Sequence, residues 1–101
     1  MKLLLITAIK EFENDVKNIL VRSGAKSFTY NEVNGFKNET NSIVTDSWFA
    51  TSYSETESLL FTVFVLEEHT AQIIEKITKF NNEQESLSNI HIALVALEQQ
   101  F

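Results

Sequence analysis

The 101-residue chain contains no cysteine, and its eight lysine and arginine residues are outnumbered by fourteen aspartates and glutamates. The absence of cysteine excludes disulfides, thiolate metal sites and cysteine nucleophiles. The net charge of −6 argues against nucleic acid as a partner, because neutralisation of phosphates by basic side chains supplies most of that affinity. No basic residue lies between Lys37 and Lys76, so an anionic membrane surface is also an unfavourable partner.

Long apolar runs are also missing, since a membrane span needs about 20 consecutive apolar residues. The opening residues Met1–Ile6 imitate a secretory signal, but the apolar run ends at Ile9, and Lys10 follows where a small-residue cleavage site is expected. We therefore interpret residues 2–9 as the first strand of a cytoplasmic protein. The length and the hydrophobic fraction of 44% predict a single folded domain over residues 1–101.

The spacing of apolar residues predicts two helices and four strands. Apolar residues recur at helical spacing over Phe12–Leu20, and Gly24 follows as a helix stop. Residues 27–33 alternate as a second strand, and Asn34 and Gly35 indicate a turn or the start of a loop. The remaining predicted elements are a strand over 58–66, a helix over 69–81, a polar loop over 81–89 and a strand over 90–97.

This order of elements, βαββαβ, is typical of the ferredoxin-like fold of the α+β class, in which a four-stranded antiparallel sheet carries both helices on one face. Between the second and third strands lies a long polar connection, residues 37–57, with aromatic residues at Trp48, Phe49 and Tyr53. Connections of this length in compact domains are usually functional or mobile, so the three aromatic residues are candidates for partner binding. Trp48 and Phe49 either pack back on the domain or anchor a partner, and we favour packing.

The predicted strands are apolar on both faces. In the third strand, Phe61 and Val63 belong to one face, while Leu60 and Phe64 belong to the other. Sheets with one solvated face normally alternate apolar and polar residues, and two helices cover only one face. The second face leaves a larger apolar patch than a monomer normally exposes, so we expect a homo-oligomer. The alternative is an isolated domain with an exposed apolar sheet.

Residues 1–36 resemble the opening of PII signalling proteins. The shared features are a Met-Lys strand, Phe12 in the following turn, a helix that ends at Gly24 and a second strand that closes with Glu-Val-Asn-Gly-Phe over residues 32–36. Glu11 stands where that family has proline, and Lys37 replaces its second glycine. CutA-type trimers, which share the fold, are the alternative. The resemblance implies a homotrimer with its sheets turned inward.

The resemblance also identifies residues 37–57 with the T-loop, through which PII proteins engage membrane transporters, enzymes or transcription factors. It further implies an ATP or ADP site between subunits, where a loop of the pattern Thr-Gly-x-x-Gly-Asp-Gly-Lys binds the phosphates through backbone N–H groups. Residues 81–89 contain no glycine and no lysine but carry Glu83 and Glu85, and residues 98–101 contain no arginine. We therefore expect no ATP or ADP bound in the usual way and no other cofactor. The candidates that remain in the ligand cleft are Gly35, Phe36, Lys37 and Asn38.

The residues that could support metal binding or catalysis are few. His69 and His91 are the only histidines and, with a carboxylate such as Glu67 or Glu68, are weak candidates for a metal site. The alternative is that both histidines are structural. Two carboxylate pairs, Glu55 with Glu57 and Glu83 with Glu85, are expected in solvated loops without the burial that acid–base catalysis needs. No catalytic residue is predicted, so we expect a protein that is not an enzyme.

The sequence thus favours a PII-like trimeric regulatory protein that acts by protein–protein contact through residues 37–57. The expected partner is a protein such as a membrane transporter or an enzyme, and no direct membrane insertion is expected. The alternative is a sensor of the same fold that binds a small ligand or a divalent metal in the cleft between subunits, near Gly35 and Phe36.

Overall fold

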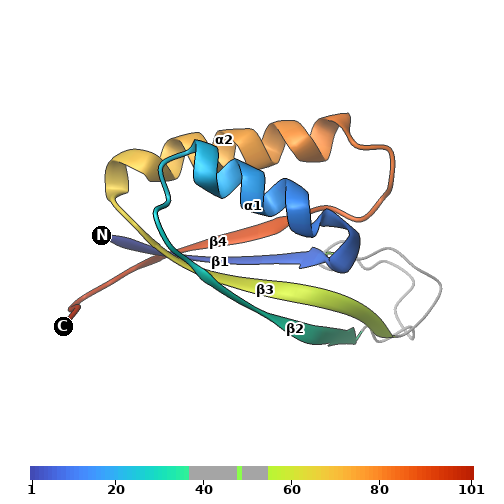
Figure 1. Ribbon diagram of the computed structural model, residues 1–101, viewed down its shortest axis with the longest axis horizontal. Helices are drawn as coiled ribbons and strands as arrows, with labels where there is room; N and C mark the ends of the chain where they lie inside the picture. Colours follow the sequence, from blue (N-terminus) through green and yellow to red (C-terminus); the bar gives the residue numbers. More distant parts are fainter. Residues whose placement is uncertain (37–47, 49–54) are drawn as a thin grey trace.

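The computed structural model describes residues 1–36, 48 and 55–101. A four-stranded sheet forms one layer and two helices form the other (Figure 1). The predicted βαββαβ order and the α+β class are confirmed. The elements are β1 (Lys2–Ile9), the 3-10 turn η1 (Lys10–Phe12), α1 (Glu13–Arg22), β2 (Thr29–Phe36), β3 (Glu55–Val65), α2 (Glu67–Glu83) and β4 (His91–Ala96).

The sheet is antiparallel throughout, with the strand order β2-β3-β1-β4. Leu4 of β1 pairs with Val63 of β3 on one side and with Leu94 of β4 on the other. Both helices cover the same face of the sheet, and they run in opposite directions across it (Figure 1). This arrangement is the one that the element order predicts.

The core lies between this sheet face and the helices. Alternate residues of β1 and β3 point into it because successive side chains of a strand face opposite sides. The helices contribute side chains four residues apart, such as Val16 with Leu20 and Ile73 with Ile77. Each fully buried leucine, isoleucine or phenylalanine side chain contributes about 1.5–3 kcal/mol. The largest fully buried side chains are Phe61, Leu4, Ile6, Leu20, Leu59, Ile73 and Ile77.

Helix α1 ends at the predicted glycine. Gly24 has φ of +95°, a left-handed conformation that glycine adopts at low cost. The Ala25 N–H donates to the Leu20 carbonyl at 3.0 Å, and the Gly24 N–H donates to the Val21 carbonyl at 3.3 Å. These two bonds form a Schellman motif, which satisfies carbonyls that the last helical turn leaves unpaired.

Several predicted boundaries are wrong. Asn34 and Gly35 form no turn but continue β2, where they pair with Glu57 and Thr56 of β3. Backbone pairing with a neighbouring strand outweighs the local turn preference of an Asn-Gly pair. Strand β2 begins at Thr29 rather than at 27, and β3 begins at Glu55 rather than at 58. The predicted connection is therefore shorter than 37–57, and residues 37–47 and 49–54 lie outside the described part of the chain.

Helix α2 is longer than predicted at both ends. It begins at Glu67, directly after an extended residue at Leu66, and runs to Glu83. Glu67 and Glu68 occupy the first turn, where negative charge interacts favourably with the helix dipole. The Thr70 hydroxyl also donates to the Glu67 carbonyl at 2.8 Å. Neither helix of the described chain combines the length and the apolar character that crossing a membrane requires.

Candidate functional site

The sheet face away from the helices carries an apolar surface, as the strand pattern predicted. Its side chains lie in rows set by the pairing of β4, β1 and β3. Phe64 is 49% exposed and Val95 is 38% exposed. We call this surface the open face. Its three rows are Val95, Leu3 and Phe64; Ala93, Leu5 and Thr62; and His91, Thr7 and Leu60.

The apolar part of the open face does not extend evenly to β2. There the register places Thr29 beside Thr62 and Asn31 beside Leu60, and both β2 residues are exposed. The apolar surface is therefore concentrated over the other three strands. A contiguous apolar patch with a polar margin is typical of an interaction surface.

Trp48 packs against one end of the open face. Its indole Nε1 donates to the Ser58 hydroxyl at 2.7 Å, and its ring meets the His91 ring edge-on, with centroids 6.3 Å apart. A hollow of about 510 Å³ lies beside it, lined by residues that include Leu5 and Leu60. The predicted packing of Trp48 on the domain is confirmed. The other partner-loop candidates, Phe49 and Tyr53, lie outside the described residues.

Two of the four cleft candidates are placed by the structure. Gly35 is buried near the end of β2, and Phe36, the last residue of that strand, is 70% exposed. Lys37 and Asn38 lie outside the described residues. The exposed ring of Phe36 marks the end of the sheet where the resemblance to PII proteins places the cleft.

The charged groups near this end of the sheet include a lysine that already has acidic partners. Lys10 Nζ lies 2.9 Å from a Glu32 carboxylate oxygen, and both residues line a hollow of about 300 Å³ with Asn34 and Glu57. The hydrogen bond and the charge of Glu32 raise the pKa of Lys10, with a further contribution from Glu57. The hydrogen bond and the charge of Lys10 lower the pKa of Glu32. One ammonium beside two carboxylates is a poor site for an added anion. Glu57 was predicted in a solvated loop, but it belongs to β3.

In residues 84–88, which lead toward β4, side chains accept hydrogen bonds from backbone N–H groups of the same segment. The Ser86 N–H donates to Gln84 Oε1 at 2.7 Å, and the Ser88 N–H donates to the Ser86 hydroxyl at 3.0 Å. Gln84 Nε2 in turn donates to the Ser86 and Ser88 carbonyls at 2.6 and 2.8 Å. A phosphate-binding loop needs such N–H groups directed outward. Here side-chain oxygens of the same segment accept them.

Asn81 joins the end of α2 to the start of β4. Its Nδ2 donates to the Ile90 carbonyl at 2.9 Å, and its Oδ1 accepts the Ile90 N–H at 2.8 Å. The predicted loop over residues 81–89 therefore begins inside the helix, since α2 continues to Glu83. Sequence reasoning missed this pair of bonds because the type of a polar residue near the end of a helix does not show which backbone groups it will bind.

The two histidines are not brought together. His91 is on the open face, whereas His69 lies in the first turn of α2, on the helix side, against Gly24. The prediction of a metal site built from both histidines of one chain is therefore wrong, because the sheet lies between them. Over residues 1–36, 48 and 55–101, no three side chains from His, Cys, Asp and Glu are grouped closely enough to hold a metal ion.

No known family model matches this sequence, and no curated protein matches it. The solved structures that share its fold include the following two. A DUF3240 family protein from Shewanella baltica OS155 aligns with a TM-score of 0.67 and 12% identity, over 99% of this chain and 92% of that chain. CPII, a nitrogen regulatory PII-like protein from Thiomonas intermedia K12 bound to ADP, AMP and bicarbonate, aligns with a TM-score of 0.60 and 17% identity, over 97% and 94%. At these identities the likeness is one of fold. The chain has the PII-like fold that residues 1–36 predicted.

Proposed function

We propose that the protein is a homotrimeric regulatory protein that acts by contact with another protein and catalyses no reaction. A fold alone does not define a function, so the proposal depends on the surface that this chain presents. The observation that carries it is the open face, where apolar side chains from three strands are left uncovered by the helices. The fold shared with CPII supports a regulatory role.

The trimer is the assembly that buries the open face. Three sheets that face a common axis would cover Phe64, Val95, Leu3 and Leu5, which the single chain leaves partly exposed. Burial of apolar surface contributes about 25 cal/mol per Å², so a patch of this kind stabilises an assembly appreciably. The polar β2 margin, with Thr29 and Asn31, would lie nearer the rim of such an interface.

Light scattering after size-exclusion chromatography, at micromolar concentration, tests this assembly. We expect three times the chain mass of 11.6 kDa. The substitution Phe64→Glu places a charge within the buried surface and should yield monomers. Val21→Glu is the matched control, because Val21 is 64% exposed on α1, away from the sheet. Wild-type protein at the mass of one chain would contradict the proposal, as would equal dissociation by both variants.

We place the contact with a partner on the connection between β2 and β3. Its sequence is long and polar and contains Phe49 and Tyr53. Because Glu55–Glu57 belong to β3, the contact segment is residues 37–54 rather than 37–57. The expected partner is a protein such as a membrane transporter or an enzyme.

A variant tests this placement by replacing residues 37–47 and 49–54 with Gly-Ser linkers of equal length and keeping Trp48. A partner that co-purifies with the wild-type chain should be lost from the variant, while the variant keeps the trimer mass. Retention of the same partner by the variant would place the contact elsewhere.

The proposal includes no ATP or ADP response by the usual mode. Three observations support this: Lys10 is paired with Glu32, Ser86 and Ser88 bind their own segment, and Glu83 and Glu85 add negative charge. A ligand at 100 times its dissociation constant stabilises a protein by about 2.7 kcal/mol. Millimolar ATP or ADP should therefore leave the melting temperature unchanged, and a rise of several degrees would contradict this part of the proposal.

A further inference from the structure

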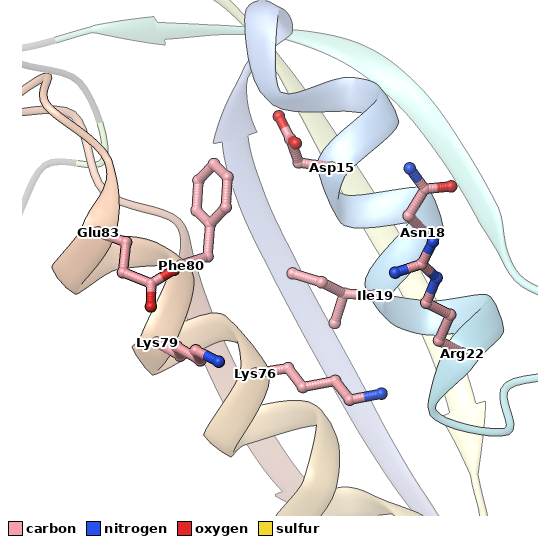
Figure 2. A pocket seen from close by; sticks show the side chains of 8 residues that line it. All are labelled: Asp15, Asn18, Ile19, Arg22, Lys76, Lys79, Phe80 and Glu83. Atoms are coloured by element: carbon pink, nitrogen blue, oxygen red, sulfur yellow. The ribbon is translucent and has the colours of Figure 1, made fainter.

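A groove between the two helices, on the side of the molecule away from the open face, has a repeated pattern of side chains. Each helix lines it with four residues at spacings of i, i+3, i+4 and i+7, which lie along one side of a helix. The third residue of each set is apolar, Ile19 on α1 and Phe80 on α2, and Figure 2 shows both projecting between the helices. The hollow has a volume of about 360 Å³.

Three cations line this α1–α2 groove: Arg22 from α1, and Lys76 and Lys79 from α2. Over the part of the chain that the structure describes, the ion pairs engage Lys2, Lys10 and Lys17 and none of these three. Two carboxylates, Asp15 and Glu83, line the same groove without pairing with them. A protein of net charge −6 thus directs three unpaired cations at one hollow.

Helix electrostatics explains only one of these cations. Arg22 lies in the last turn of α1, where positive charge offsets the helix dipole. Lys76 and Lys79 precede the last turn of α2, which contains no basic residue. Figure 2 shows Lys76 extending from α2 toward α1, at the same end of the groove as Arg22. The positions of the two lysines are therefore explained by a bound anion rather than by the dipole of α2.

The groove is also polarised along its length. The helices are antiparallel, and Phe12, before α1, contacts Phe80 of α2, so Asp15 and Glu83 lie toward one end and Arg22 and Lys76 toward the other. Asp15 and Arg22 are seven residues apart, about 10 Å along the axis. The apolar floor of Ile19 and Phe80 lies between these ends.

We propose that the α1–α2 groove binds a small organic anion: a carboxylate or phosphate ester head at Arg22, Lys76 and Lys79, with an apolar body over Ile19 and Phe80. Charge-assisted hydrogen bonds from guanidinium and ammonium groups suit either head group. The apolar body of the ligand must end within about 10 Å of the anionic head, because a second anionic group at that distance would be repelled by Asp15 and Glu83. The site lies within one chain, so it does not depend on the proposed trimer.

Two-dimensional ¹H–¹⁵N NMR of the full chain with phenyl phosphate and phenylacetate as probes tests the site. We expect saturable shift changes confined to residues 15–22 and 76–83. Inorganic phosphate, which lacks a body, and benzyl alcohol, which lacks a charge, should each bind at least tenfold more weakly. Equal affinity for inorganic phosphate, or changes spread over the whole surface, would overturn the proposal.

Variants distinguish anion binding in the groove from a general effect of surface charge. Arg22→Gln combined with Lys76→Gln should weaken phenyl phosphate binding roughly tenfold, since each exposed charge contact contributes modestly. Lys26→Gln is the matched control, because Lys26 is an exposed cation outside the groove. Asp15→Asn should strengthen binding by removing an opposing charge. Equal weakening by Lys26→Gln, or no strengthening by Asp15→Asn, would overturn the proposal, and the single variants Arg22→Gln and Lys76→Gln replace the double variant if it fails to fold.

Discussion

The imidazole of His69 lies so close to Gly24 that a Cβ on Gly24 would come within 2.9 Å of both Cε1 and Nδ1. This contact joins the end of α1 to the first turn of α2. Glycine is required here for two independent reasons. Its φ of +95° is strained for any residue with a side chain, and the ring occupies the space that a side chain would fill.

The substitution Gly24→Ala should lower the free energy of unfolding by about 2–3 kcal/mol, since the left-handed conformation alone costs about 1–2 kcal/mol. Urea denaturation measures the loss. In a His69→Ala background the ring is absent, so Gly24→Ala should cost about 1 kcal/mol less. Equal costs in the two backgrounds would show that the ring moves aside freely.

The hydrogen bond from Trp48 to Ser58 gives a second prediction. Trp48→Phe keeps an aromatic ring but removes the donor, and it should lower the free energy of unfolding by about 1 kcal/mol. Ser58→Ala removes the acceptor. The double variant should lose less than the two single variants together, because both remove the same bond. Strict additivity in urea denaturation would show that this bond is not formed in solution.

Asn81 provides a third prediction, because its amide satisfies both backbone polar groups of Ile90. Asn81→Ala should lower the free energy of unfolding by about 2 kcal/mol, at about 1 kcal/mol for each lost bond. It should also speed hydrogen exchange at the Ile90 amide. Asn82→Ala, at the exposed neighbouring position, is the control and should change little. Similar losses for the two variants would contradict the assignment.

The ion pair of Lys10 and Glu32 predicts a dependence of stability on pH. The pKa of Glu32 is lowered from 4.5, so its stabilising contribution is present above 4.5 and is lost as the pH falls through the folded value. The pKa of Lys10 is raised from 10.5, so its contribution is present below 10.5 and is lost as the pH rises through the folded value. Wild type should therefore exceed Glu32→Gln in stability by a constant amount between these limits, and the difference should close beyond each.

Melting temperatures across this pH range measure that difference. Both groups are exposed, so the effect should be small and should nearly vanish in 1 M NaCl. Glu98→Gln removes an exposed carboxylate near the end of the chain and serves as the charge-matched control. A difference of the same size for both variants at every pH would show that net charge, rather than the ion pair, is responsible.

Much of the fold could be predicted from the sequence. The 3.6-residue spacing of Val16, Leu20, Ile73 and Ile77 identified both helices, because a helix that covers a sheet needs one apolar stripe. Gly24 marked the end of the first helix through its conformational freedom. The apolar residues on both faces of the strand predicted over residues 58–66 indicated the open face. These are local properties, which short stretches of chain express by themselves.

The candidate sites could be predicted only in part. The sequence showed that residues 81–89, before β4, contain no glycine, but it did not show that Gln84 and Asn81 bind the backbone there. It placed His69 and His91 as a possible pair, although the sheet separates them. The spacing of Asp15 to Arg22 and of Lys76 to Glu83 was present in the sequence, but nothing local indicated that the two stripes face each other.

By itself, then, the sequence determined the elements, their order and the apolar second face of the sheet, because these follow from periodicity and from the conformational limits of single residues. Only the tertiary structure decided which side chains meet: Trp48 with Ser58, His69 with Gly24, and Arg22 in one groove with Lys76. Such contacts join residues distant in the chain. Their energies depend on the packing of whole elements, which a local pattern does not encode.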